Sequence, residues 1–160
     1  MLLVVGGAYA GKRKIVRSQM NHNRCEWISA YEGHRLERWR DVWVKTDTIV
    51  IEGWERWLKQ ALHKGQSIDE LRERMQNHLQ ALAHVEQERR ACHAHKDRRD
   101  VGDHVILIML EMGRGVVPMD KSDRDLRDLC GWLLQDATQL SERVLYVWHG
   151  LYKQLKGNGT

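Results

Sequence analysis

The sequence is short of cysteine, and its three cysteines (Cys25, Cys92 and Cys130) include no C-x-x-C pair. An odd number of cysteines without paired spacing argues against the disulfide framework of small secreted domains. The N-terminus also lacks the basic region and the long apolar core of a signal peptide. These absences predict a cytoplasmic protein with reduced thiols.

Long apolar runs and blocks of like charge are also missing. The longest strongly apolar stretch, 104–110, falls far short of the roughly 20 residues that span a bilayer, so we expect a soluble chain with no membrane partner. Basic and acidic residues alternate, as in 71–74, without the basic stripe of a nucleic-acid-binding face. The net charge of +4 nevertheless favours small anionic partners such as nucleotides.

No linker, internal repeat or low-complexity segment divides the chain, so we expect a single domain over residues 1–160. Short β-branched runs alternate with longer amphipathic segments, which predicts an α/β fold with a mostly parallel sheet and helices on both faces. The predicted strands are 2–5, 25–30, 42–44, 49–51, 104–110 and 144–148. Residues 105–109 are all apolar, as expected of a strand in the middle of the sheet.

Two long helices are predicted between these strands. Ser67 and Glu70 form a capping box, and apolar residues then recur at helical spacing: Ile68, Leu71, Met75, Leu82 and Val85. A second helix begins near Ser122 and carries a single apolar stripe: Leu126, Leu129, Cys130, Leu133, Ala137 and Leu140. We interpret both stripes as core.

A glycine-rich segment follows the first predicted strand and matches the G-x-x-x-x-G-K pattern of a phosphate-binding loop. This segment, residues 6–12, is called the phosphate loop and consists of Gly6, Gly7, Ala8, Tyr9, Ala10, Gly11 and Lys12. Glycines let successive backbone amides turn toward a phosphate, the next helix offers its positive N-terminus, and Lys12 reaches the β and γ oxygens. The pattern predicts a nucleoside triphosphate, GTP or ATP, as the ligand.

The residue after the lysine is Arg13, where such loops carry the Ser or Thr that binds magnesium. Arg13 is expected either to contact phosphate itself or to point away from the site. Glu52 and Glu111 end two apolar strands, and we expect both at the carboxyl edge of the sheet beside the phosphate loop. Glu52 is the candidate ligand for Mg²⁺.

Other signals favour structural roles. Cys92, His93 and His95, with His84 and His104, superficially suggest a transition-metal site, but no second ligand pair completes it, so we favour a solvated helix end. His78 lies on an apolar stripe and is expected to be a hydrogen-bonded core residue. Most of the seven tryptophans are expected in the core, although Trp132 and Leu134 lie off the last helical stripe and suggest contact with another subunit.

Segments at both ends of the chain resemble one known family. Residues 111–118 (E-M-G-R-G-V-V-P), followed by Arg124, Arg127, Asp128 and Gly131, are similar to the E-V-G-x-G-I-V-P and R-x-x-R-D-x-x-G signature of adenosylcobinamide kinase/adenosylcobinamide-phosphate guanylyltransferases. The phosphate loop matches the G-G-A-x-x-G-K opening of that family. Gly150, Leu151, Leu155 and Lys156 match its final motif.

The resemblance implies a three-layer, P-loop NTPase-like (RecA-like) fold and an enzyme of cobalamin biosynthesis. Such an enzyme phosphorylates a hydroxyl of the corrinoid adenosylcobinamide and then exchanges that phosphate for a GDP linkage. His34, in the H-R-x-x-R segment 34–38, matches the histidine that carries the guanylyl group in the family. The catalytic residues implied are therefore Lys12 and His34, and a homo-oligomer, with a trimer as the expected form, is implied as well.

The sequence departs from the family pattern at several polar positions. Arg13 replaces a hydroxyl residue, Trp39 a proline and Leu110 an asparagine, while residues 53–55 lack the usual C-L-T. Two alternatives therefore stay open beside the enzyme: a non-catalytic nucleotide-binding or corrinoid-sensing paralogue, and a small-molecule kinase with another substrate.

Overall fold

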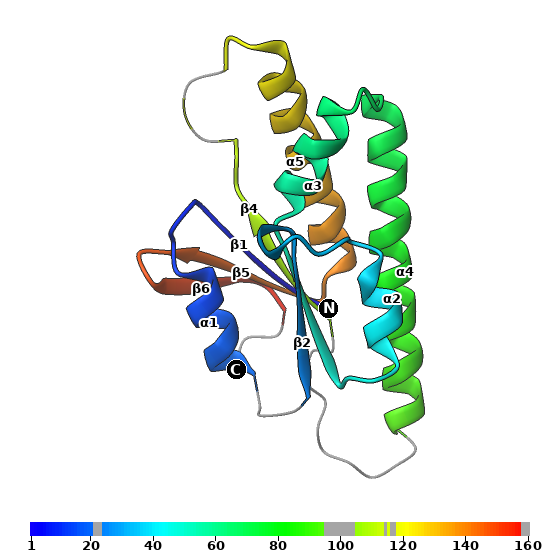
Figure 1. The fold of residues 1–160 in the computed structure, drawn as a ribbon. Helices are drawn as coiled ribbons and strands as arrows, with labels where there is room; N and C mark the ends of the chain where they lie inside the picture. The colour runs from blue at the N-terminus through cyan, green and yellow to red at the C-terminus, as the bar shows by residue number, and fades with distance from the viewer. Residues whose placement is uncertain (21–23, 95–104, 114, 116–117, 158–160) are drawn as a thin grey trace.

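The computed structural model describes residues 1–20, 24–94, 105–113, 115 and 118–157, and Figure 1 shows the path of the chain. The elements follow one another as β1 (Leu2–Gly6), α1 (Lys12–Gln19), β2 (Cys25–Ser29), the 3₁₀ turn η1 (Ala30–Glu32), α2 (Arg38–Trp43), β3 (Thr48–Glu52), α3 (Trp54–His63), α4 (Ile68–Ala94), β4 (Val105–Leu110), α5 (Lys121–Leu140), β5 (Arg143–Trp148) and β6 (Leu151–Lys156). Helices thus alternate with strands over most of the chain.

The strands form one six-stranded sheet in the order β2-β3-β4-β1-β5-β6. β1 pairs in parallel with β4 and β5, and β3 pairs in parallel with β2 and β4. Among the described strands β6 alone runs antiparallel, paired with β5 at the edge of the sheet. Because parallel strands end at the same edge, the carboxyl ends of β1, β3 and β4 meet where the predicted site residues lie.

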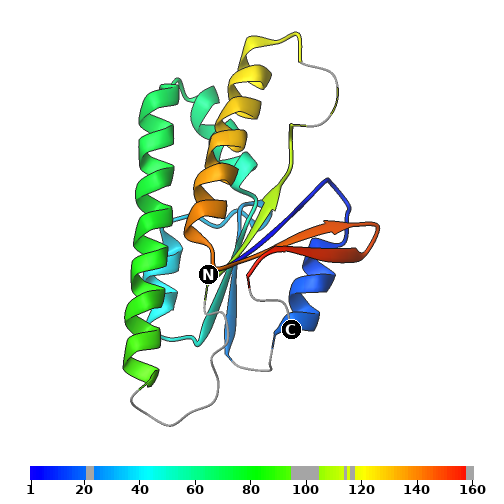
Figure 2. The same ribbon diagram turned by 180° about the vertical axis from the view of Figure 1, so that it is seen from behind.

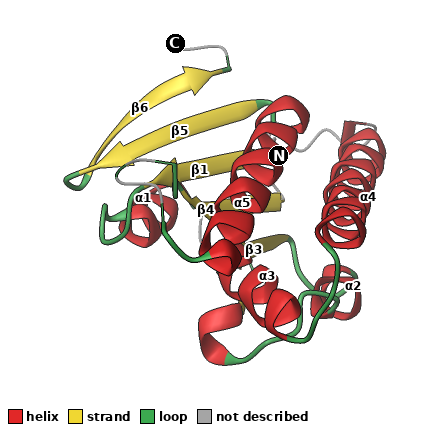
Figure 3. Cartoon of the chain, turned by 90° about the horizontal axis from the view of Figure 1, so that it is seen from above, coloured by secondary structure: helices red, strands yellow, loops and turns green. Residues whose placement is uncertain are grey.

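Helices cover the two faces of the sheet unequally (Figures 2 and 3). On one face, α1 is the only helix within the described part of the chain, and it packs Ile15 and Val16 against the sheet. The larger core on the other face takes its helical residues from α2, α3, α4 and α5. β1 serves both cores, because Leu2 and Val4 point to one and Leu3 and Val5 to the other. The result is the predicted three-layer α/β architecture.

Five of the six predicted strands are confirmed, with ends that differ by a residue or so. β4 lies between β3 and β1, as its continuous apolar run predicts, and His104 lies outside the described residues. The prediction of a strand at 42–44 is wrong, because 42 and 43 belong to α2. The physical reason is helical spacing: Trp39, Val42 and Trp43 face the same core, and Trp39 is buried there.

The two predicted long helices are confirmed as α4 and α5. Before α4, the Ser67 hydroxyl accepts a hydrogen bond from the Glu70 amide at 3.2 Å and the Glu70 carboxylate accepts one from the Ser67 amide at 3.4 Å, as in a capping box. The apolar stripe of α5 is buried except for Leu140 at its end. None of the described helices is long and apolar enough to cross a membrane.

Trp132 has its partner within the same chain. The guanidinium of Arg72 on α4 lies 4.7 Å from the centre of the Trp132 ring, and Trp132 and Leu134 both pack partly buried against the larger core. Periodicity shows that Trp132 lies off the main stripe of α5, but it does not show that α4 packs beside α5, so the sequence alone suggests a second subunit as the partner. The off-stripe position of Trp132 is therefore explained without a second subunit.

Candidate functional site

The phosphate loop leads from the central strand β1 into the N-terminus of α1. A Cβ on Gly6 would lie 2.2 Å from the backbone oxygen of Val147, so glycine alone fits at this point. Gly11 and Tyr9 both adopt positive φ, 97° and 57°, and the Tyr9 side chain is fully exposed. The amide of Gly150, in the turn between β5 and β6, donates to the Ala10 carbonyl at 2.9 Å. The conformation of the phosphate loop near the N-terminus therefore depends on contacts with β5 and the β5–β6 turn near the C-terminus.

The first turn of α1 has the charge pattern of an anion site. It contains no acidic residue, Gly11 provides no side-chain cap, and Lys12, Arg13 and Lys14 follow one another. Cations at a helix N-terminus oppose the helix dipole, which favours negative charge at that end. This arrangement is favourable when an anion lies in front of the helix.

Lys12 is half-buried at the centre of the loop. Its ammonium donates to the carbonyls of Gly6 and Gly7 at 2.9 and 2.6 Å. Burial lowers the pKa of Lys12, and the nearby carboxylates of Glu55 and Glu52 act in the opposite direction. Lys12 is therefore not free in solvent: its ammonium bonds back to the loop and has to leave two carbonyls to reach a phosphate.

A cavity of about 890 Å³ opens in front of the loop and α1. This volume lies within the range of ligand pockets that hold a nucleotide-sized molecule. Its lining comprises Ala8, Tyr9, Ala10, Gly11, Lys12, Arg13, Lys14, Arg17, Tyr31, Glu52, Gly53, Glu55, Ile108 and Leu110. Six of the predicted nucleotide-binding residues of the loop and its flank line it, together with Glu52.

The Arg13 guanidinium is bound to the Glu52 carboxylate. Nε of Arg13 donates to Oε2 of Glu52 at 2.8 Å, and Nη2 donates to Oε1. Glu52 is buried, whereas the Arg13 side chain is 47% exposed toward the cavity. The hydrogen bond to Glu52 raises the pKa of Arg13, which is thus charged at any physiological pH. The two residues lie 39 positions apart in the sequence, and β4 lies between β3, which ends at Glu52, and β1, which precedes the phosphate loop and α1.

Glu111 lies beside the loop but outside the cavity lining. Its amide donates to the Gly6 carbonyl at 3.1 Å, and its carboxylate accepts a hydrogen bond from the Tyr146 hydroxyl at 2.8 Å. Gly6 and Gly7 likewise are not among the described lining residues; Gly6 ends β1 instead. The position of Glu111 at the carboxyl edge is as predicted, whereas contact with a nucleotide stays a prediction.

His34 follows η1 and is held by the backbone of Ser29 and by Trp57. The Ser29 amide donates to Nδ1 of His34 at 3.2 Å, and the indole of Trp57 donates to the His34 carbonyl at 2.8 Å. Because Nδ1 accepts from a backbone N–H, the proton of the neutral imidazole resides on Nε2. His34 is not one of the described residues that line the 890 Å³ cavity, so this conformation does not bring it together with Lys12.

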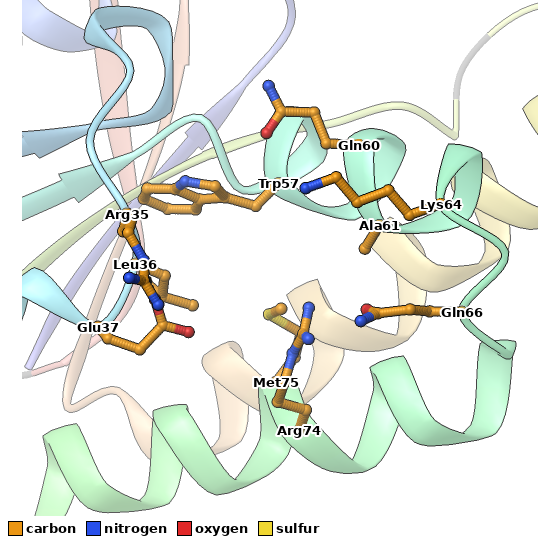
Figure 4. Close-up of a pocket in the computed structure, with 10 residues that line it drawn as sticks. All are labelled: Arg35, Leu36, Glu37, Trp57, Gln60, Ala61, Lys64, Gln66, Arg74 and Met75. Carbon is orange, nitrogen blue, oxygen red and sulfur yellow. Dashed lines mark ion pairs between the residues drawn. The ribbon is translucent and has the colours of Figure 1, made fainter.

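A second, smaller cavity of about 150 Å³ lies between the segment 35–37, α3 and α4 (Figure 4). Trp57 forms one wall, and the lining contains three basic residues, Arg35, Lys64 and Arg74, and one acidic residue, Glu37. This volume is below that of ordinary ligand pockets, which argues against it as the nucleotide site. The larger cavity is therefore the candidate functional site.

Several lining residues of the larger cavity are not predicted from the sequence, among them four with polar or charged side chains. Lys14 and Arg17 extend the cationic side of α1, and the Arg17 guanidinium lies 5.5 Å from the centre of the Trp27 ring. Opposite them, the Tyr31 hydroxyl donates to the Glu55 carboxylate. The spacing of Arg17, four residues after Arg13 on one helix face, is the signal that identifies it. Tyr31 and Glu55 have no comparable pattern.

Two arginines of the family-like signature hold the loop after β4. Arg124 donates to the carbonyls of Pro118, at 3.2 Å, and Met119, and Arg127 donates to the carbonyl of Gly113 at 3.1 Å. Arg114, Val116 and Val117 of the same signature lie outside the described residues. The arginines that are described thus position the backbone at the carboxyl edge of β4.

The donor set at the loop does not fit a magnesium ion. Mg²⁺ needs hard oxygen ligands, but residue 13 has no hydroxyl, both oxygens of Glu52 accept from Arg13, and Glu55 accepts from Tyr31. In the part of the chain that the structure describes, no group of three or more His, Cys, Asp or Glu side chains can hold a metal ion. Cys92 is exposed near the end of α4, while His95 and His104 lie outside the described residues.

Comparison with protein families gives one match. The model of the family described as cobinamide kinase / cobinamide phosphate guanyltransferase matches residues 2–155, nearly the whole chain. The matched range includes the phosphate loop, the signature after β4 and all of β6 except Lys156, and it confirms the resemblance that these motifs carry. A comparison with individual proteins of curated function finds no match.

Proposed function

Because the chain belongs to the cobinamide kinase / cobinamide phosphate guanyltransferase family, whose members are transferases of cobalamin biosynthesis that use nucleoside triphosphates, we propose that it binds GTP or ATP in the 890 Å³ cavity. The observation that carries this proposal is the cavity itself, which the loop, α1 and Glu52 line together. The phosphates lie against the loop amides, Lys12 moves from the loop carbonyls to them, and the apolar side chains of Ile108 and Leu110 contact the rest of the ligand.

The first proposed reaction is phosphoryl transfer to cobinamide. The hydroxyl oxygen of the corrinoid side chain attacks the γ-phosphorus, the bond from that phosphorus to the β–γ bridging oxygen breaks, and a nucleoside diphosphate leaves. The hydroxyl proton is lost to solvent. Lys12 and the loop amides stabilise the charge on the transferred group, because catalysis of this reaction depends mainly on positioning and electrostatics.

The second proposed reaction is guanylyl transfer through His34. An imidazole nitrogen attacks the α-phosphorus of GTP, the bond to the α–β bridging oxygen breaks, and pyrophosphate leaves. A phosphate oxygen of the corrinoid then attacks the same phosphorus and breaks the P–N bond, which regenerates the imidazole. Since Nδ1 accepts from Ser29 and Nε2 carries the proton, the ring has to leave the Ser29 amide and approach the loop before it reacts.

Replacement of Lys12 tests the nucleotide site. We expect Lys12→Ala to weaken GTP binding by at least about tenfold, because a charge-assisted contact to phosphate is lost. The free energy of unfolding should change by less than about 1 kcal/mol, since Lys12 bonds only to loop carbonyls in the absence of ligand. Calorimetric titration with GTP measures the affinity, and Lys59→Ala, at an exposed lysine of α3, is the matched control. Equal affinities for both variants would refute the loop assignment.

Labelling with α-³²P-GTP tests His34. The proposal predicts label on the protein that is stable to base and labile to acid, as a phosphoramidate is, and its absence from His34→Ala. Label that persists in His34→Ala would assign the nucleophile to another residue. Mass analysis of adenosylcobinamide after incubation with GTP or ATP separates the remaining alternatives. GTP binding without any change in the corrinoid would favour a protein that only binds its ligands. Phosphorylation of another acceptor, with the corrinoid unmodified, would favour a kinase with a different substrate.

A further inference from the structure

Arg13, the residue after the lysine of the phosphate loop, places a positive charge where other phosphate loops have a metal ligand. Arg13 occupies the position at which phosphate loops carry the magnesium-binding hydroxyl. Its guanidinium donates to the carboxylate of Glu52, which is the other candidate ligand for the metal. Both oxygens of Glu52 are engaged, and the pair is half shielded from water because Glu52 is buried. A cation already occupies this corner of the site.

The guanidinium keeps donors free for a ligand. Arginine has five N–H donors in one plane. Glu52 accepts from Nε and from Nη2, which leaves both N–H groups of Nη1 and one of Nη2. Arg13 lines the 890 Å³ cavity, and the Tyr31 ring, with its centre 5.8 Å from the guanidinium carbon, supports the group from another side. A fixed guanidinium with adjacent free N–H groups matches two oxygens of a phosphate.

The charge of the cavity does not require an added metal ion. Lys12, Arg13, Lys14 and Arg17 contribute four positive charges to the lining, and Glu52 and Glu55 contribute two negative ones, a balance of +2. A magnesium ion normally offsets the negative charge of a triphosphate and orients its β and γ oxygens. Here the positive charge is supplied by side chains of α1, next to the loop that positions the phosphates.

Building on the proposed nucleotide site, we propose that the Arg13 guanidinium, fixed by Glu52, replaces the magnesium ion, so that this protein binds the free nucleoside triphosphate rather than its metal complex. Glu52 is in this view a positioning residue for Arg13 and not a metal ligand. Lys14 and Arg17 add the remaining positive charge along the phosphates.

Titration calorimetry with GTP in the presence of EDTA or of excess Mg²⁺ tests this replacement. The wild-type protein should bind GTP in EDTA at least as tightly as in Mg²⁺, because Mg²⁺ removes free triphosphate from solution. Arg13→Ser restores the hydroxyl and frees the Glu52 carboxylate. We expect this variant to lose affinity by at least about tenfold in EDTA and to recover it when Mg²⁺ is added.

Two further variants separate the pair from simple loss of charge. Lys14→Ser removes one positive charge from the same helix turn without affecting Glu52, and it should weaken GTP binding while leaving it independent of Mg²⁺. Glu52→Gln keeps the shape of the side chain but weakens the contact that fixes Arg13, so GTP binding should weaken to the same extent in EDTA and in Mg²⁺. A magnesium ligand at position 52 would instead show its loss as weaker binding in Mg²⁺ alone.

The outcomes also separate this inference from the proposed function. Wild-type binding of GTP that requires Mg²⁺, or an Arg13→Ser variant that binds equally well in EDTA, would overturn the replacement of the metal and leave the nucleotide site intact. Wild-type protein that binds neither GTP nor ATP under either condition would refute the proposed function itself, and the replacement with it.

Discussion

His78 lies on the core-facing side of α4 and is only 6% exposed. Its Nδ1 accepts a hydrogen bond from the Trp39 indole at 3.3 Å, and its Nε2 lies 3.9 Å from the Glu37 carboxylate. Burial lowers the pKa of His78 and so does the charge of Arg40, while Glu37 acts in the opposite direction. The hydrogen-bonded core histidine predicted from its place on the apolar stripe is confirmed.

The lowered pKa of His78 makes stability depend on pH. Above about pH 6.5, the ordinary pKa of histidine, the side chain is neutral in both the folded and the unfolded state. Below that pH the unfolded chain takes up the proton first, so the free energy of unfolding should fall with pH, by up to about 1.4 kcal/mol per pH unit, until the folded His78 is protonated too. Urea denaturation between pH 7.5 and 5 measures the slope.

His78→Asn is the comparison, because asparagine keeps an acceptor for Trp39 but does not titrate. The wild-type slope should exceed that of the variant, and equal slopes would assign the pH dependence to other groups.

At the scale of single residues, sequence spacing identifies groups but not their partners. Lys12 and Glu52 can be placed at one edge of the sheet because a glycine-rich loop and an apolar strand precede them. The contact between Arg13 and Glu52 cannot be predicted in this way, since it depends on the reach of one side chain across β4. For His34 the motif likewise gives the residue, whereas the backbone amide that engages its Nδ1 is known only from the fold.

The start of α5 depends on one side chain. Oδ1 of Asp120 accepts hydrogen bonds from the amides of Ser122, at 2.7 Å, and Asp123, at 3.4 Å. We expect Asp120→Ala to lower the free energy of unfolding by about 1 kcal/mol, because two helix amides lose their acceptor. Asp120→Asn retains a cap and should stay within about 0.5 kcal/mol of the wild type in chemical denaturation. A similar loss in both variants would point to charge rather than capping.

At the scale of elements, the helices and strands that were predicted are those with the strongest apolar pattern, and the strand that was missed has a weak one. α4 and α5 are long and strongly periodic, and the buried strands are apolar throughout. β6 is missed because Leu151 and Leu155 recur at helical spacing, most of its residues are exposed, and it pairs on one side only. A two-residue turn, with His149 and Gly150 both at positive φ, sets it antiparallel to β5.

At the scale of the whole molecule, exposed apolar residues gather on β6, one of the two edge strands of the sheet. Leu151 and Leu155 are 63% and 59% exposed. Open sheet edges and exposed apolar patches favour association. The oligomer implied by the family resemblance stays a proposal, and we expect the exposed face of β6 to form the contact between subunits.

We expect sedimentation equilibrium to give a multiple of the 18.8 kDa chain mass, with three copies as the predicted assembly. Replacing both Leu151 and Leu155 with lysine should shift the protein to a monomer. Met119→Lys, at an exposed methionine before α5, should not. A monomeric wild-type protein would contradict the proposal.

The unequal covering of the sheet links ligand binding to the integrity of one layer. α1 has eight residues, of which Ile15 and Val16 are buried against its face of the sheet. An isolated helix of this length is marginal in water. Its first turn contains Lys12, Arg13 and Lys14 and no acidic residue, and Glu52 pairs with Arg13, so a polyanion bound there and the folded α1 would stabilise each other. A triphosphate bound as proposed would therefore act on folding as well as on catalysis, because a ligand that binds only the folded layer shifts the equilibrium toward it.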